Sequence, residues 1–177
     1  METKSVMRSA HILGQTLLLI FIVLLASIVV LVVWSIVDLP RIGQTLSVNV
    51  GYGGIVLRWW QGLAFVMFLL VQIGIWAAAV WQGRQIFTAL TTGALIDASI
   101  AASKTAWLLW GILIWGIVAH ILGTVVATWH FPEGTQALGV AIGPTQISTA
   151  LAALLATFTS HAFVLGAALW QDHQEVI

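Results

Sequence analysis

The chain contains no cysteine and very little charge. Its 177 residues include six lysines or arginines and six aspartates or glutamates, so the formal net charge is zero. Without cysteine there is no disulfide, zinc–thiolate site, iron–sulfur cluster or thiol nucleophile. The balanced charge argues against a nucleic-acid partner. A soluble domain carries about 25% charged residues. This chain carries 7%, with 60% hydrophobic residues and a mean hydropathy of +1.06, so its expected solvent is a lipid bilayer.

Four apolar stretches are long enough to cross a bilayer, which requires about 20 residues. We predict membrane spans at residues 12–37, 57–80, 105–128 and 147–170. The first stretch follows Lys4 and Arg8 but is too long for the apolar part of a signal peptide, so we expect a membrane helix there. The sequence therefore predicts an all-α membrane protein, with residues 1–177 forming a single four-helix transmembrane bundle.

The basic residues predict the orientation of these spans, because cytoplasmic loops are enriched in lysine and arginine. Four basic residues fall on one side of the membrane: Lys4, Arg8, Arg84 and Lys104. Two fall on the other side: Arg41 and Arg58. We therefore expect both termini in the cytoplasm, and the protein in the cytoplasmic (inner) membrane of a bacterium.

The connections carry further patterns. Residues 46–50 and 138–142 alternate apolar with polar or small residues, as short strands do. Both fall on the outer side, so we expect them to pair as a small β cap, since a lone strand leaves its backbone groups unmatched. On the inner side the second helix is expected to extend to Gly93, and Asp97 or Ser99 to begin the third.

Small residues form a stripe along the fourth span. They recur at helical spacing and so share one face: Thr149, Ala152, Ala153, Ala156, Thr157 and Ser160. Gly74 and Ala78 form a similar pair on the second span. Membrane helices associate through small residues that allow close approach, so we expect contacts between helices at these positions. The alternative is a stripe that lines a substrate path.

Few polar side chains lie within the predicted spans. No Asp, Glu, Lys or Arg lies deep in any span, which disfavours ion-driven transport. The polar candidates that remain are Gln15, Gln72, His120 and His161, with His11 at an inner edge. Two histidines on neighbouring helices are candidates to ligate haem. At 1.5 Å per residue, however, they lie about 12 and about 20 Å from the outer helix ends, an offset that opposes a shared haem. A neutral histidine bonded across the bundle is the simpler interpretation.

The surroundings of His120 suggest another cofactor. Gly116-Ile-Val-Ala-His120, with Trp129-His-Phe-Pro132 beyond, is similar to the membrane helix of bacterial light-harvesting β polypeptides. That resemblance implies bacteriochlorophyll ligation by His120.

Hydrolytic chemistry is disfavoured, because neighbours such as Ser160 and His161 point about 100° apart on a helix and no acid is available to orient the imidazole. We expect no catalytic residue and no metal site.

The overall layout resembles a family of uncharacterised four-span bacterial membrane proteins, a domain of unknown function often encoded beside a small Cro-type helix-turn-helix regulator. The matching segments are the sequence from Trp81 to Gly93, the strand-like residues 138–142, and the end from Ala167 to Val176. Members usually carry several basic residues before the third helix, where this chain has only Lys104. The resemblance implies a regulatory or accessory membrane component.

The sequence thus predicts a non-enzymatic accessory or regulatory subunit that packs against other integral membrane proteins. Its expected partners are the lipid bilayer and other membrane subunits, without nucleic acid. A subunit that binds bacteriochlorophyll or haem through His120 is the alternative, followed by a small transporter component.

Overall fold

The computed structural model describes residues 2–48, 51–52, 56–132, 138–140 and 142–175. These ranges contain four helices, which are α1 (Glu2–Ser47), α2 (Trp59–Thr92), α3 (Leu95–Thr128) and α4 (Pro144–Glu175). Each helix is long and apolar enough to cross a membrane. The prediction of an all-α protein with four helices suited to a bilayer is confirmed.

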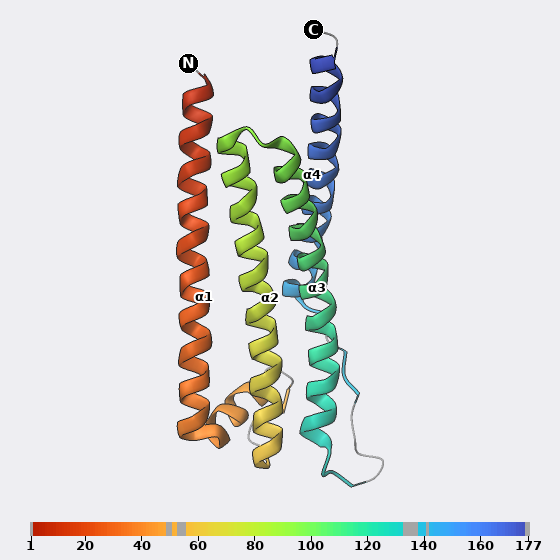
Figure 1. Ribbon diagram of the computed structural model, residues 1–177. Helices are drawn as coiled ribbons and strands as arrows, with labels where there is room; N and C mark the ends of the chain where they lie inside the picture. Colours follow the sequence, from red (N-terminus) through yellow and green to blue (C-terminus); the bar gives the residue numbers. More distant parts are fainter. Residues whose placement is uncertain (1, 49–50, 53–55, 133–137, 141, 176–177) are drawn as a thin grey trace.

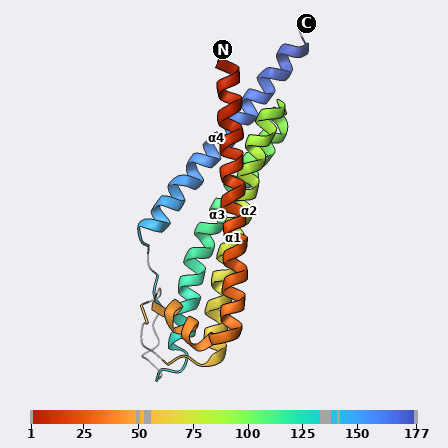
Figure 2. The ribbon, with the colours of Figure 1, turned by 90° about the vertical axis from the view of Figure 1, so that its left-hand side faces the viewer.

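The helices form an open row. The start of α1, the α2–α3 turn and the end of α4 lie at one end, which we call the termini end (Figure 1). The α1–α2 connection lies at the opposite end, where the α3–α4 connection also begins (Figure 1). The backbone N–H of Gly139 in the α3–α4 connection lies 3.4 Å from Thr124 Oγ1, so this connection runs back along α3 before α4 starts. The main contacts join α1 to α2, α2 to α3 and α3 to α4, and Figure 2 shows α4 inclined to the other three helices. As a result α2 and α3 occupy the middle, and α1 and α4 are edge helices.

A bend at Asp38 divides α1 into a long helix and a short terminal segment. Asp38 has a non-helical backbone (φ −149°, ψ 65°), and Pro40 follows it. Proline has no N–H to donate, and its ring clashes with the preceding turn, so a straight helix does not continue through it. Asp38 Oδ1 accepts a hydrogen bond from the backbone N–H of Arg41 at 3.2 Å and so caps the segment beyond the bend. That segment turns across the bundle towards α2 (Figure 1).

Two glycines bring this segment against α2. A Cβ atom added to Gly43 would lie 2.7 Å from the Cα of Gly62, and one added to Gly62 would lie 3.3 Å from the carbonyl oxygen of Leu39. Both glycines are buried. Since only glycine lacks a Cβ, the pair allows the two backbones to approach more closely than other residues would.

The predicted outer β cap is wrong, because the residues that the structure describes contain no strand. Leu46 and Ser47 end α1, Val48 lies in the following turn, and residues 138–140 and 142 are irregular; Asn49, Val50 and Ala141 lie outside the described residues. Side chains supply the contacts that a second strand was expected to make. Ser47 Oγ lies 2.8 Å from the Gln44 carbonyl and 2.9 Å from that of Tyr52.

The turn between α2 and α3 is tight, as expected. Gly93 ends α2 in the left-handed conformation (φ +75°), and the N–H of Ala94 bonds to the carbonyl of Ala89 at 2.9 Å. A left-handed glycine is the usual end of such a helix, so the prediction for Gly93 is confirmed. The predicted start at Asp97 or Ser99 is wrong. The turn is so short that α3 already begins at Leu95, with Asp97 in its first turn.

Candidate functional site

A groove between α2 and α3 brings two of the polar candidates together. Gln72 from α2 and His120 from α3 line a cavity of about 230 Å³, whose other walls are apolar or small: Leu46, Phe65, Phe68, Leu69, Gly116 and Ala119. By helical rise, Gln72 lies about 20 Å from the start of α2 and His120 about 12 Å from the end of α3. Both depths fall inside the spans.

Neither polar group has a hydrogen-bond partner among the described residues. Every fully enclosed side-chain nitrogen or oxygen in this part of the chain has a partner, so the free atoms of Gln72 and His120 reach accessible space. Both residues are half-buried. An unpaired amide or imidazole at membrane depth is unfavourable, because lipid offers nothing with which it can bond. The groove therefore presents two unsatisfied polar groups.

Aromatic side chains fix the wall beside this groove. The indole N–H of Trp115 donates to the backbone carbonyl of Phe68 at 3.2 Å. The rings of Phe68 and Trp115 meet edge to face with centroids 6.3 Å apart, and Phe65 meets Phe68 in the same way at 6.3 Å. Such aromatic pairs hold their rings in defined orientations. The wall is thus preorganised by the contact between α2 and α3.

A second cavity, of about 340 Å³, adjoins the first and shares Gln72 and Gly116 with it. It reaches the beginning of α4, where Thr145, Gln146 and Thr149 contribute to the lining. Gln146 Oε1 already accepts the backbone N–H of Gly143 at 2.9 Å. Gln72 therefore stands between two adjoining cavities that run from the α2–α3 groove to α4.

The stripe of small residues on α4 lies mainly against α3. Thr149, Ala153 and Ser160 are buried, Ala156 and Thr157 are half-buried, and Ala152 is exposed. Thr157 Oγ1 accepts the indole N–H of Trp110 at 3.2 Å and donates to the carbonyl of Ala153 at 2.7 Å. The face thus joins α4 to α3 through close packing and through one hydrogen bond between helices.

The small pair on α2, Gly74 and Ala78, was expected to contact a neighbouring helix, but both residues lie on an exposed face. A Cβ added to Gly74 would meet no atom within 4 Å. The buried alanines of this part of α2 are Ala77 and Ala79. Because α2 is apolar on all sides, spacing alone does not show which small residues face a neighbouring helix.

The structure does not bring His120 and His161 together. His161 lines a separate cavity between α3 and α4, whose α3 residues run from Ser103 to Ile114, and this cavity shares no residue with the His120 groove. The shared-haem interpretation is therefore not supported by the geometry, since the two ligands of one haem face each other across the iron.

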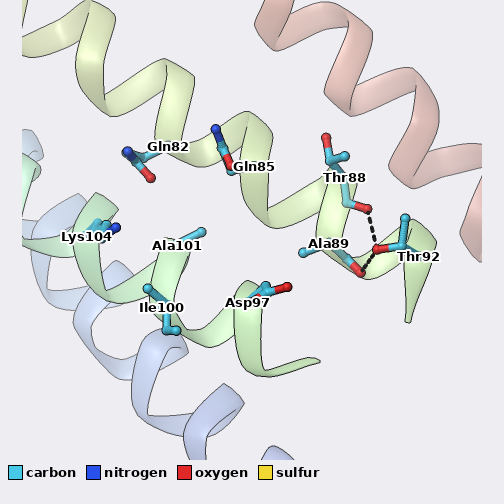
Figure 3. Close-up of a pocket in the computed structure, with 9 residues that line it drawn as sticks. All are labelled: Gln82, Gln85, Thr88, Ala89, Thr92, Asp97, Ile100, Ala101 and Lys104. Atoms are coloured by element: carbon cyan, nitrogen blue, oxygen red, sulfur yellow. Dashed lines mark hydrogen bonds between the residues drawn. The ribbon is translucent and has the colours of Figure 1, made fainter. Parts of the chain in front are cut away.

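A polar cavity of about 360 Å³ lies at the termini end, where α2 meets α3 (Figure 3). Its lining includes Gln82, Gln85 and Thr92 from α2, and Asp97 and Lys104 from α3. Thr92 Oγ1 is engaged with the carbonyls of Thr88 and Ala89 at 3.3 and 3.0 Å. Asp97 and Lys104 are both exposed. This lining suits the water-facing tip of the α2–α3 hairpin.

Sequence reasoning missed Gln61, which is fully buried at the opposite end. Its Nε2 donates to the Val126 carbonyl at 2.6 Å and lies 3.2 Å from His130 Nδ1, while its Oε1 accepts the N–H of Arg58 at 2.7 Å. The available signal was its place three residues after Arg58, the residue that precedes α2, where glutamine often caps a helix.

The cavities hold few groups suited to a metal. Among the described residues, no cluster of three or more His, Cys, Asp or Glu side chains occurs. A single ring nitrogen, such as that of His120, is the kind of ligand that a metal carried within a pigment takes.

Comparison of the chain with models of protein families, with characterised proteins and with solved structures gave no match in any of the three.

Proposed function

We propose that this protein is a non-enzymatic accessory subunit of the bacterial inner membrane that docks against another integral membrane protein through the α2–α3 groove. The observation that carries this proposal is the pair of unpartnered polar side chains, Gln72 and His120, on one groove at membrane depth. A partner helix that presents a polar side chain at each of these two depths would satisfy both. The resemblance to a four-span bacterial family favours the same role and stays a prediction.

The energetics favour a helix as the occupant. A hydrogen bond between membrane helices contributes about 0.6 kcal/mol on average and seldom more than about 2 kcal/mol. Two such bonds give specificity, and close packing must supply the rest. Apart from His120, the α3 side of the groove is lined by the small residues Gly116 and Ala119, which favours close approach of another backbone. We therefore expect the partner helix to carry small residues with polar side chains among them.

The orientation belongs to the same proposal. Arg84 and Lys104 lie towards the termini end, whereas Arg41 and Arg58 lie at the opposite end. With the N-terminal Lys4 and Arg8, the termini end holds four basic residues, which supports a cytoplasmic location for it.

Photocrosslinking in cells tests the docking. A photoreactive amino acid at Ala119 lies in the groove, and one at the exposed neighbour Val118 is the matched control. We expect a protein adduct from position 119 only, and its loss in a Gln72→Leu/His120→Leu variant. The proposal would be contradicted by equal adducts from both positions, or by an adduct of twice 19.1 kDa, which would be a second copy of this chain. It would also be contradicted if the protein remained a 19.1 kDa monomer under every mild extraction.

Pigment binding is the second candidate, and one observation favours it. Gly116 lines the same cavity as His120, and no atom lies within 4 Å of a Cβ added to it, so there is room beside the α3 backbone one turn before His120. A Cβ added to Gly139 would lie 3.9 Å from His120 Nε2, so the α3–α4 connection borders the imidazole itself. The cavity of about 230 Å³ is smaller than most pockets for drug-sized ligands, so a macrocycle would have to project from the groove. A visible absorption spectrum of the purified protein decides between the two candidates: pigment bands that His120→Leu removes would favour the pigment.

A further inference from the structure

The cavity that contains His161 is distinct from the docking groove. It has a volume of about 420 Å³, within the range for small-molecule sites. Its polar and aromatic lining comes from two helices, with Ser103, Trp107 and Trp110 on α3 and Ser160 and His161 on α4. Trp107 is 76% exposed and His161 is also exposed. The cavity therefore opens sideways, towards the lipid that surrounds such helices.

The hydrogen bond of His161 determines what its ring can accept. Nδ1 lies 2.8 Å from the carbonyl oxygen of Thr157. A carbonyl only accepts hydrogen bonds, so Nδ1 carries the proton. In the neutral ring, Nε2 is then an unprotonated acceptor. No partner occupies this nitrogen among the described residues, so His161 offers a fixed acceptor beside the cavity.

Ser160 provides a second, independent polar group. The residue is only 6% exposed, yet its hydroxyl has no hydrogen-bond partner in the described part of the chain, and it lines the cavity. Most other serines and threonines of these helices bond back to a carbonyl of the preceding turn, as Thr159 does to Leu155 at 2.8 Å. The Ser103 hydroxyl, on the facing helix, is likewise unpartnered among the described residues. Both are free to donate to a bound molecule or to accept from it.

The aromatic walls are held in place. The indole N–H of Trp110 is engaged with Thr157 Oγ1 at 3.2 Å, which fixes this side chain between α3 and α4. The same Thr157 residue accepts the His161 bond through its carbonyl. One threonine thus orients both an aromatic wall and the histidine acceptor. A flat ring that carries a hydroxyl would meet aromatic surface and hydrogen-bonding groups together.

We propose that this cavity binds the head group of a lipid-soluble quinol. The sideways opening selects a molecule that reaches the site from the bilayer, and the indoles favour a ring. Nε2 of the neutral His161 accepts an O–H, which a quinol has and the oxidised quinone lacks. The serine hydroxyls are placed for the remaining oxygen of the ring. This binding does not depend on the proposed docking at the α2–α3 groove.

Binding of a decyl-substituted benzoquinol, kept reduced without oxygen, tests the site through quenching of tryptophan fluorescence in the full-length protein. The matched probe is its dimethyl ether, which keeps the ring and tail but has no O–H. We expect the ether to bind wild type about tenfold more weakly, which corresponds to about 1.4 kcal/mol. This comparison needs no variant, so it does not depend on how well a variant folds.

Variants then locate the site. His161→Phe keeps a ring but removes the acceptor and is expected to weaken quinol binding about tenfold, whereas His161→Gln restores an acceptor and part of the affinity. His11→Phe, an exposed histidine on α1 that does not line this cavity, is the control and should leave the affinity unchanged. The proposal would be overturned by equal affinities for quinol and ether, by equal affinities of wild type and His161→Phe, or by an equal loss in His11→Phe. Absence of quinol binding to the wild-type protein would also overturn it.

Discussion

The side-chain amide of Gln61, near the start of α2, donates to the backbone carbonyl of Val126, near the end of α3, at 2.6 Å. The last four carbonyls of a helix have no partner within that helix, and Val126 belongs to this set because α3 ends at Thr128. The same glutamine accepts the N–H of Arg58. One buried residue thereby satisfies the ends of two helices.

Gln61→Leu is expected to lower the free energy of unfolding by about 1–3 kcal/mol, because it leaves the part-buried N–H of Arg58 and the part-buried carbonyl of Val126 without a partner. The measurement is thermal or denaturant unfolding in detergent, followed by circular dichroism. Gln85→Leu, an exposed glutamine of the same helix, is the control and should change stability little. Equal effects of the two substitutions would mean that the buried network contributes nothing specific.

Gly43→Ala should destabilise the protein by about 1–3 kcal/mol, because the new methyl group would press against Gly62 at 2.7 Å and force the bent end of α1 away from α2. Gly74→Ala is the matched control, since nothing lies within 4 Å of the added atom. Alanine is the better helix former, so this control should be neutral or slightly stabilising. A Gly43→Ala variant as stable as wild type would show that the close approach is unnecessary.

Ala153→Leu should loosen the contact between α3 and α4. Ala153 is fully buried, and adding bulk to a tight helix crossing costs about 1–3 kcal/mol. Ala152→Leu, on the exposed side of the same turn, should be tolerated. The two variants can be compared by melting temperature and by proteolysis at the α3–α4 connection. If both behave as wild type, α4 is not held by this face.

The proposed orientation predicts which introduced cysteines react in intact cells. The chain has no cysteine of its own, so Val56→Cys, in the α1–α2 connection, and Thr92→Cys, at the end of α2, each give a single exposed thiol at opposite ends of the bundle. A membrane-impermeant thiol reagent should label position 56 and label position 92 only after the cells are broken. The reverse pattern would place the termini end outside the cell.

The four helices could be predicted from the apolar runs alone, because membrane depth sets the length of a span. The extension of α2 to Thr92 was predicted, but α1 extends beyond its predicted span, from Glu2 to Ser47. Residues 46–48 alternated like a strand, but Ser47 bonds to the Tyr52 carbonyl and closes the chain into a turn after α1. A local pattern of alternation does not anticipate a side-chain cap of this kind.

The candidate site was only partly predictable. Gln72, His120 and His161 stood out individually because polar side chains are rare in such spans. Their grouping was not predictable, since helices that are apolar on every side give no indication of which faces meet. The pairing of Gln72 with His120, and the separation of His161 from both, follow from the register of α2 and α4 on α3.

The open row has a consequence for how the chain assembles. Its main contacts join helices that are neighbours in sequence, so each helix, as it leaves the ribosome and enters the bilayer, finds its principal partner already inserted. Contacts between sequence neighbours close short loops and favour rapid folding. No helix has to wait for a distant one, and α4, the last to arrive, can be lost or delayed without opening the α1–α3 unit.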